Sequence, residues 1–286
     1  LTWYLPLVQA PLLVAVVAAG APDEGTWIVG AGGHLATIDV DHIAVRVDGP
    51  AVSLRDIATI GGALVAVGEW GRIVRESEDG HALSDSPTDA GLAALAPLDE
   101  GHLLAVGDLG ALVRIGWDGA ELLTSPDTSV SYRDVVASGG QVTIVGTGGA
   151  IVRGTPDALA VRREEGLGDL WAIAGTPDDA LVVGDAGVVL RLTGGDVARV
   201  PCAVTTSLRS VVRMTDGTAF AVGEAGVAVR IEETGCVREH EGGPTLNAIG
   251  VGPDGRPLAA GDEGTSLVRG DDGKWRIALY ALRPRA

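Results

Sequence analysis

The sequence predicts an all-β fold, a seven-bladed β-propeller with four antiparallel strands in each blade. Two glycines three residues apart recur seven times along the 286 residues, and successive copies lie 38 or 39 residues apart. A repeat of about 40 residues with strand-like content is typical of one propeller blade. Short apolar runs separated by Gly and Asp clusters indicate strands joined by turns, and no segment keeps a helical period.

The paired glycines mark one hairpin in each repeat. The first glycines are Gly30, Gly68, Gly107, Gly146, Gly184, Gly223 and Gly261. The second glycines are Gly33, Gly71, Gly110, Gly149, Gly187, Gly226 and Gly264. Glycine suits a tight hairpin because it tolerates positive φ and lets another backbone approach closely.

The third repeat shows the expected order of strands. Its apolar runs are Leu92–Pro97, His102–Val106, Ala111–Ile115 and Ala120–Leu123. The same order along the chain gives a single domain over residues 1–286, because an unbroken repeat favours one closed ring over two domains. The expected blades are approximately 12–50, 51–88, 89–127, 128–166, 167–204, 205–242 and 243–286.

Ring closure has two possible arrangements. The last repeat has four strands of its own, the fourth over Trp275–Leu282, and residues 1–11 supply an extra closing strand at Thr2–Val8. Either the N-terminal strand closes the last blade and the C-terminal segment adds to it, or the reverse holds. Leu5–Ala21 is similar to the core of a signal peptide. We interpret it as structure, because the repeat needs Leu12–Ala18 as the first strand of the first blade.

Charge restricts the possible partners. The chain has 21 Lys and Arg residues against 38 Asp and Glu residues, a formal net charge of −17. Phosphate contacts need cationic side chains, so this balance argues against nucleic acid and disfavours an anionic membrane surface. It favours a basic or neutral protein surface as partner, without direct membrane insertion.

Two cysteines, Cys202 and Cys236, leave two alternatives open. They form a disulfide, or they are two buried or half-buried thiols.

The fifth repeat illustrates a family resemblance that extends to all seven repeats and is best in the second to the sixth. Its segment Leu170–Arg191 reads LWAIAGTPDDALVVGDAGVVLR. It resembles a repeat of the exported bacterial propellers in the sialidase-like (BNR or Asp-box) superfamily, and the unit VGxxGxIVR also resembles the photosystem II assembly-factor propellers. The Asp-box turn is degenerate here, because Ser77–Gly80 lacks the Trp and Asp271–Trp275 is its nearest relative.

The resemblance implies a propeller that holds other proteins, is often exported, and is only sometimes an enzyme. Together with the absence of Met at position 1, it favours a bacterial protein that is periplasmic, exposed at the cell surface or secreted.

Seven or eight residues after the first glycine, six repeats place an arginine. These form a possible basic ring of Arg75, Arg114, Arg153, Arg191, Arg230 and Arg269. Such a ring could hold a partner carboxylate. The alternative is structural: each arginine pairs with an acidic turn of its own blade or the next one.

An acidic residue directly follows the first glycine in five repeats, at Glu69, Asp108, Asp185, Glu224 and Asp262. These acids could present a negative face to a basic partner. Turn preference alone also explains an acid after glycine.

The start of the innermost strand varies between repeats and is the best candidate for partner binding. The predicted binding residues are Arg55, Asp56, Arg133, Asp134, Trp171, Arg209 and Asn247, with Ala93 in the equivalent place of the third repeat. Innermost strands line the central channel of a propeller, so these side chains would form a polar mouth, the usual form of a ligand site. Local Arg–Asp pairing that only fills the channel is the alternative.

No sequence motif indicates a metal site or a cofactor. The five histidines fall at unrelated repeat positions, and no acidic cluster has the full calcium-loop pattern. A sialidase-type enzyme needs a tyrosine nucleophile, and Tyr132 is the only tyrosine on a predicted inner strand between the first and last blades. The tryptophans do not repeat at one position, which disfavours a multivalent lectin.

We therefore expect a non-catalytic scaffold that binds a partner protein, or a subunit of a larger assembly, through one propeller face. The alternative is a sialidase-like or lyase-like enzyme, or a lectin, acting on an anionic glycan at the channel mouth. In an enzyme, Tyr132, Asp56 and Asp134 would be required for turnover.

Overall fold

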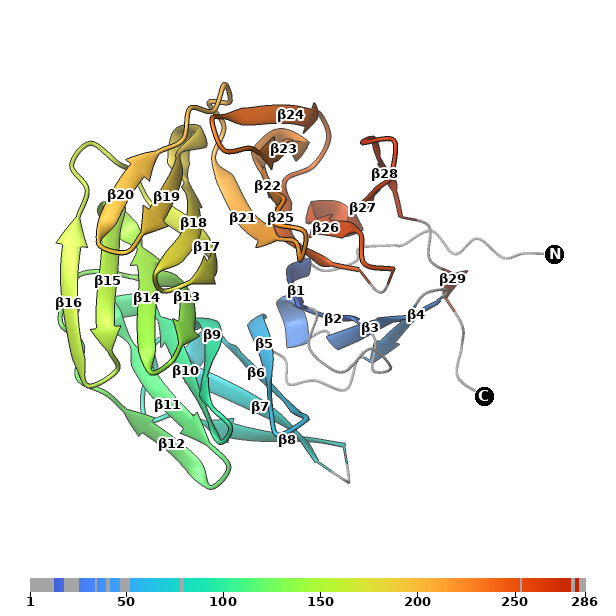
Figure 1. The fold of residues 1–286 in the computed structure, drawn as a ribbon. Helices are drawn as coiled ribbons and strands as arrows, with labels where there is room; N and C mark the ends of the chain where they lie inside the picture. The colour runs from blue at the N-terminus through green and yellow to red at the C-terminus, as the bar shows by residue number, and fades with distance from the viewer. Residues whose placement is uncertain are drawn as a thin grey trace.

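A computed structural model describes residues 13–17, 26–33, 35–39, 42–46, 52–77, 80–252, 254–278 and 281–282. Its strands form six four-stranded antiparallel sheets and one five-stranded sheet, and in each sheet the strands follow one another in sequence order. The innermost strands lie around a common central axis, with the later strands of each sheet progressively farther out (Figure 1). The all-β propeller expected from the sequence is confirmed.

Each four-stranded sheet is named here by its innermost strand. The β5 sheet contains β5 (Leu54–Ile60), β6 (Ala63–Gly68), β7 (Arg72–Ser77) and β8 (Gly80–Asp85). The β9 sheet contains β9 (Leu92–Asp99), β10 (His102–Gly107), β11 (Leu112–Gly116) and β12 (Gly119–Leu122). The β13 sheet contains β13 (Tyr132–Ser138), β14 (Gln141–Gly146), β15 (Ala150–Thr155) and β16 (Ala158–Arg163). The β17 sheet contains β17 (Leu170–Thr176), β18 (Asp179–Gly184), β19 (Val189–Thr193) and β20 (Asp196–Arg199). The β21 sheet contains β21 (Leu208–Arg213), β22 (Ala219–Gly223), β23 (Ala228–Ile231) and β24 (Cys236–His240). The β25 sheet contains β25 (Leu246–Val251), β26 (Pro257–Gly261), β27 (Ser266–Arg269) and β28 (Trp275–Ile277).

The five-stranded sheet joins the two ends of the described chain. It contains β1 (Leu13–Val17), β2 (Thr26–Gly30), β3 (Leu35–Asp39), β4 (His42–Arg46) and β29 (Ala281–Leu282). The C-terminal β29 runs parallel to β4, with Ala281 opposite His42. The predicted strand over Trp275–Leu282 is therefore divided: β28 ends where the Ala278 N–H bonds to the Ser266 carbonyl, and β29 pairs with another sheet. The predicted N-terminal strand Thr2–Val8 lies outside the described residues.

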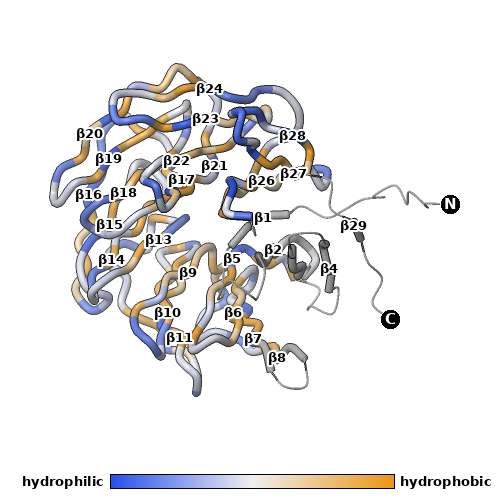
Figure 2. Tube along the Cα trace, turned by 45° about the vertical axis from the view of Figure 1, so that its right-hand side comes forward, coloured by the Kyte–Doolittle hydropathy of each residue, from blue (hydrophilic) through white to orange (hydrophobic). Residues whose placement is uncertain are grey.

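The core lies between neighbouring sheets. Val67 of the β5 sheet packs in one cluster with Leu103 and Val113 of the β9 sheet, all fully buried. Similar clusters, composed mostly of Val, Leu, Ile and Ala, join each later pair of four-stranded sheets, as β-branched and small side chains suit close sheet packing. Figure 2 shows hydrophobic segments along the strands and hydrophilic segments at many turns.

The repeated glycine pair forms a tight hairpin at one end of every sheet, called here the tip hairpin. Its three central residues form the short turns η1 (Ala31–Gly33), η2 (Glu69–Gly71), η3 (Asp108–Gly110), η4 (Thr147–Gly149), η5 (Asp185–Gly187), η6 (Glu224–Gly226) and η7 (Asp262–Gly264). The middle residue has φ between 54° and 70°, and the second glycine has φ between 65° and 77°. Two successive left-handed residues match the twist of a hairpin, and the second position needs glycine.

The first glycine of the pair has a different purpose. Gly107 has an extended φ of −171°, which any residue adopts. A Cβ there would lie 2.1 Å from the carbonyl oxygen of Gly91, the residue before β9. That carbonyl accepts a 2.8 Å hydrogen bond from the Asp108 N–H. The glycine is therefore needed for close approach between the tip hairpin and the start of the innermost strand.

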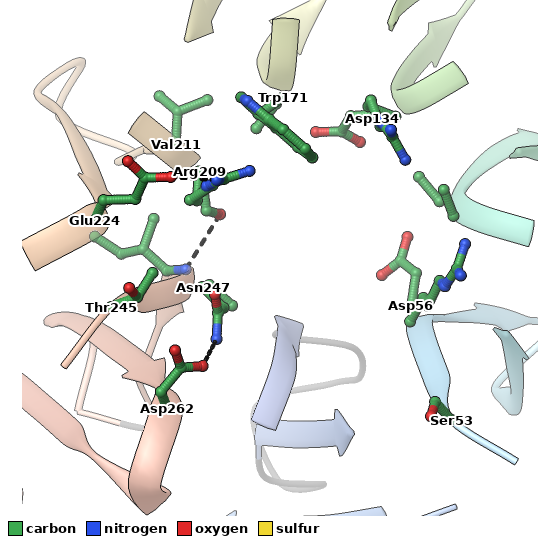
Figure 3. A pocket seen from close by; sticks show the side chains of 18 of the residues that line it. Ser53, Asp56, Asp134, Trp171, Arg209, Val211, Glu224, Thr245, Asn247 and Asp262 are labelled. Carbon is green, nitrogen blue, oxygen red and sulfur yellow. Dashed lines mark hydrogen bonds and ion pairs between the residues drawn. The ribbon is translucent and has the colours of Figure 1, made fainter. Parts of the chain in front are cut away.

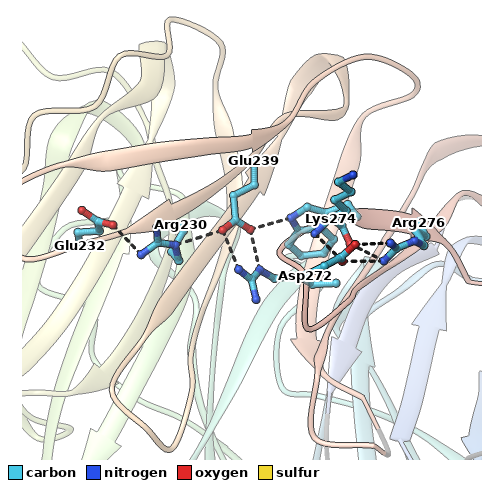
Figure 4. A network of polar contacts seen from close by, with 8 residues as sticks. Arg230, Glu232, Glu239, Asp272, Lys274 and Arg276 are labelled. Carbon is cyan, nitrogen blue, oxygen red and sulfur yellow. Dashed lines mark hydrogen bonds and ion pairs between the residues drawn. The ribbon is translucent and has the colours of Figure 1, made fainter.

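Glu239 on β24 joins the β21 and β25 sheets (Figure 4). Arg269 donates two hydrogen bonds to its carboxylate, of 2.7 and 2.8 Å, and Arg230 and the Trp275 indole each donate one. Burial opposes ionisation of Glu239, but these donors, Arg269 foremost, outweigh it and lower its pKa. With a side chain only 9% exposed, Glu239 neutralises arginines from both sheets at one seam of the ring.

A disulfide between Cys202 and Cys236 decides the alternative that the sequence left open. Cys202 lies in the connection from β20 to β21, and Cys236 begins β24. The link closes a loop with a sequence separation of 34 residues, which restricts the unfolded chain and stabilises the fold by about 3–4 kcal/mol.

Gly107→Ala is expected to destabilise the protein by about 3 kcal/mol or more, because the new methyl group would overlap the Gly91 carbonyl. Gly119→Ala is the matched control in the same sheet, since a Cβ there meets no atom within 4 Å. Its effect should stay within about 0.5 kcal/mol. Urea unfolding of both variants measures the difference, and equal stabilities would contradict the close-approach argument.

Glu239→Ala is expected to cost about 3 kcal/mol of unfolding free energy, because Arg269 loses its ion pair with Glu239 and Arg230 keeps only its pair with the more exposed Glu232. Glu241→Ala serves as control, since Glu241 forms only an exposed pair with Arg238. Thermal and urea unfolding would refute the seam role of Glu239 if both variants lost the same small amount.

Candidate functional site

A cavity of about 700 Å³ opens where the innermost strands begin, and it is called here the mouth cavity (Figure 3). All seven predicted binding residues line it: Arg55, Asp56, Arg133, Asp134, Trp171, Arg209 and Asn247. Ala93 lines it too, as do the tip-hairpin acids Glu69, Glu224 and Asp262. The structure thus brings the predicted residues together; that they bind a partner stays a prediction.

A bulge near the start of each innermost strand positions the side chain of the strand's second residue. In β5, Leu54 pairs with Gly68 and Asp56 with Val67, so Arg55 is the extra residue. The same shift leaves Arg133, Trp171, Arg209 and Asn247 unpaired at the equivalent places. A bulge redirects a side chain out of the alternating pattern, which explains why these residues meet at the mouth.

Three of these side chains bond to the tip-hairpin acid of their own sheet. The Trp171 indole N–H donates to Asp185 at 2.7 Å, and the Asn247 amide donates to Asp262 at 2.6 Å. Arg209 forms an ion pair with Glu224. The acids that follow the first glycine therefore orient the mouth residues, which turn preference alone does not explain.

The β9 sheet departs from this scheme because Ala93 offers no polar group. Its tip acid Asp108 instead accepts a 3.0 Å hydrogen bond from Arg55 of one neighbouring sheet. Its other oxygen lies 3.6 Å from Arg133 of the sheet on the other side. Because Arg55 bonds to Asp108, it does not bond to Glu69, the tip acid of the β5 sheet to which Arg55 belongs. The carboxylate of Glu69 therefore has no bonding partner among the described residues.

Trp171 is flanked by arginines from the two neighbouring sheets. The guanidinium carbon of Arg209 lies 4.0 Å from the indole centroid and that of Arg133 lies 4.9 Å from it. Cation–π contacts of this kind hold both cations in place next to the cavity.

The second residue of the bulge forms a bond between neighbouring sheets, which the sequence reasoning missed. Asp56 accepts from the Leu95 N–H at 2.7 Å, Asp134 from the Ile173 N–H at 2.8 Å, and the Ser210 hydroxyl from the Ile249 N–H at 3.2 Å. The intervening sheets have alanine at this place, namely Ala94, Ala172 and Ala248. The sequence contained a signal for these bonds, because the second residue of the bulge is polar in every second repeat.

Asp56 and Asp134 are the most perturbed acids of the mouth. Burial raises the pKa of each to about 7, and the neighbouring Asp134 carboxylate adds to the shift at Asp56. Hydrogen bonds from Leu95 and Ile57 oppose the shift at Asp56, and those from Ile173 and Val135 oppose it at Asp134. Within the described residues, no cation pairs with either carboxylate.

The possible basic ring is engaged between sheets. Arg75 donates to the Gly116 carbonyl, Arg114 to Asp157, Arg153 to the Gly194 carbonyl and Arg191 to the Glu232 carbonyl, each time in the following sheet. Arg230 and Arg269 share Glu239. These bonds favour the structural alternative for the six arginines.

Tyr132 does not line the mouth cavity. Its side chain is fully buried, its hydroxyl lies 3.1 Å from the Ser125 hydroxyl, and burial raises its pKa. A tyrosine that is both buried and protonated is poorly suited to nucleophilic attack.

Comparison with known proteins gives structural likeness only. No protein-family model and no curated protein sequence matches this chain. The WD40 β-propeller domain of Doa1 is 12% identical, with a TM-score of 0.74 over 93% of this chain and 96% of that chain. This likeness shows the fold.

Two further structures are similar. Virginiamycin B lyase from Staphylococcus aureus, solved as an inactive variant with quinupristin, is 16% identical, with a TM-score of 0.67 over 78% of this chain and 83% of that one. YCF48 bound to D1 peptide is 20% identical, with a TM-score of 0.56 over 67% of this chain and 68% of that one. Membership in the sialidase-like superfamily stays a prediction.

Asp56 and Asp134 should make stability depend on pH. Their pKa is about 7 in the folded protein against 3.8 for the ordinary group, so the folded state holds the extra protons between these values. The free energy of unfolding therefore falls as pH rises through this range. Urea unfolding at about pH 5 and about pH 8 should show a larger loss for wild type than for Asp56→Asn/Asp134→Asn. Equal losses in both proteins would contradict the assignment, since histidines and other acids are common to both.

Proposed function

We propose that this protein is a non-catalytic interaction scaffold that binds a partner protein at the mouth cavity. The convergence of Arg55, Arg133, Arg209 and Trp171 on one cavity is the observation that supports this most directly. Arg and Trp dominate the binding energy of many protein interfaces. A central position at the end of a closed ring suits a site that one partner segment enters.

The side chains at the mouth are already held in fixed orientations in the protein without a partner. Bulges aim the side chains, tip acids hold Trp171, Arg209 and Asn247, and Asp108 holds Arg55. Such preorganisation reduces the entropy lost on binding. The arginines retain N–H groups that could donate to carbonyl and carboxylate oxygens of a partner.

Likeness to other propellers is consistent with this proposal. Doa1 contributes a WD40 domain to the comparison, and YCF48 is described with a bound D1 peptide. By analogy with the peptide complex, a propeller of this shape can hold an extended segment of another protein.

An enzyme is the second candidate, and one observation favours it. Asp56 and Asp134 face the mouth cavity with pKa values of about 7, which would suit general acid–base chemistry. The virginiamycin B lyase likeness is consistent with such chemistry. In that case Asp56→Asn or Asp134→Asn would abolish turnover on anionic glycan substrates while the fold survives. Absence of wild-type turnover across a glycan panel would reject the enzyme.

We further propose that the five-stranded sheet acts as the seventh blade, which β29 completes from the C-terminal side. The chain is a propeller of the sialidase-like type. It is exported to the periplasm, the cell surface or the exterior, which the Cys202–Cys236 disulfide supports because disulfides persist in oxidising compartments. Within the described residues, no helix has the length and apolar character needed to cross a membrane.

The test is a quantitative pull-down from the native source with wild type and Arg55/Arg133/Arg209→Ala. Each buried contact is worth about 2 kcal/mol, so the variant should lose at least roughly 30-fold in affinity for the captured protein. The matched control is Arg162/Arg199/Arg238→Ala, which removes three exposed arginines from outer strands. A partner retained equally by all three folded proteins would reject the mouth as the binding site.

A further inference from the structure

Two exposed apolar side chains occupy unfavourable backbone conformations, each directly after a tip acid that lines the mouth cavity (Glu69) or bonds to a lining arginine (Asp108). Trp70 is 69% exposed and Leu109 is 70% exposed, at the centre of neighbouring tip hairpins η2 and η3. Their φ angles are 60° and 55°. The left-handed region costs a non-glycine residue roughly 1–2 kcal/mol.

Folding does not require large residues at these places. The equivalent positions in the other tip hairpins are Gly32, Gly148, Ala186, Ala225 and Glu263. A single exposed apolar residue is ordinary on a protein surface. Two of them, on adjacent sheets and each at an unfavourable φ, stabilise nothing that is evident within the described structure. An intermolecular contact would account for them.

The cavity beside these tips has an excess of acid. Three arginines line it against five acids: Asp56, Glu69, Asp134, Glu224 and Asp262. Asp56 and Asp134 ionise only near pH 7, and a cation that enters the cavity would favour their ionised forms. Arg55 and Arg133 share Asp108, and Arg209 pairs with Glu224, so the arginines already have counter-charges. Glu69, Asp56 and Asp134 have none among the described residues.

Both features lie in the same sector of the mouth. Glu69 lines the cavity and is the chain neighbour of Trp70, and Asp56 belongs to the same β5 sheet. Asp134 comes from the sheet that follows Leu109 around the ring. Figure 3 shows Asp56 and Asp134 on one side of the cavity, across from Glu224 and Asp262.

We infer that the mouth recognises a protein segment in which apolar side chains flank a lysine or arginine. The apolar side chains contact Trp70 and Leu109, and the basic side chain enters the cavity between Glu69, Asp56 and Asp134. This inference rests on the proposed function and names the chemistry of the partner. The chain's net charge of −17 attracts the same kind of segment at long range.

The experiment selects a phage-displayed random peptide library on immobilised wild-type protein. Enriched peptides are then synthesised, and their dissociation constants are measured by fluorescence polarisation. We expect peptides with Lys or Arg between apolar residues. We expect Trp70→Gly/Leu109→Gly to bind them at least 10-fold more weakly while being as stable as wild type or more so, because glycine suits the left-handed region.

Matched controls separate the inference from general effects. Ala186→Gly/Ala225→Gly makes the same backbone change at two other tips and should leave binding unchanged. Glu69→Gln/Asp56→Asn/Asp134→Asn should weaken binding at least 10-fold. Thr143→Val removes another bond between sheets, from the Thr143 hydroxyl to the Pro177 carbonyl, at a residue that does not line the mouth cavity, and should leave binding unchanged.

Three outcomes would overturn the inference. Enriched peptides that are acidic, or that lack a basic residue, would reject its chemistry and leave a scaffold with another partner class. Basic peptides bound equally well by the glycine variant would indicate only general attraction to an acidic protein. If no peptide were enriched, the inference would fail, and the arginine pull-down would decide the proposed function separately.

Discussion

The structure depends on one hydrogen bond that recurs around the ring. The N–H after the first glycine donates to the carbonyl that precedes the innermost strand: Glu69 to Ser53, Asp108 to Gly91, Thr147 to Ser131, Asp185 to Asp169, Glu224 to Ser207 and Asp262 to Thr245. Only glycine leaves room for this contact, since a Cβ there would lie 2.0–2.5 Å from the carbonyl oxygen. The bond fixes the tip hairpin against the bulge, and so places each tip acid next to a mouth residue.

Small departures from the repeat make the distribution of charge around the mouth cavity asymmetric. Alanine at position 93 leaves Asp108 without a partner in its own sheet, and Arg55 and Arg133 of the two neighbouring sheets pair with it instead. Gly91 makes this possible, because a Cβ there would lie 2.8 Å from the Asp108 carboxylate and 2.9 Å from Arg55. The carboxylate of Glu69 is then left without a bonding partner among the described residues. The asymmetry of charge around the cavity therefore follows from two small residues in one blade.

The sequence predicted the fold well because its period is visible in the chain itself. The glycine pairs located every tip hairpin, and the residues after the inner-strand leucine located the mouth. The sequence could not reveal partners that come from other sheets, such as Arg55 on Asp108 or Asp56 on the Leu95 N–H. For Arg75 and Arg114 it left open a basic ring and a pairing within or between blades, and their bonds reach the next sheet. Contacts about 40 residues apart depend on blade packing, which a local pattern does not contain.

The claim that a partner docks at the mouth is tested most directly by site-specific photo-crosslinking in the native source. A photoreactive phenylalanine analogue replaces Trp70, or Ile277 on the outer strand β28, two side chains with 69% and 71% exposure. One partner protein should be crosslinked at Trp70 and not at Ile277. Crosslinking at Ile277 alone, or to the same proteins from both positions, would contradict a docking site at the mouth.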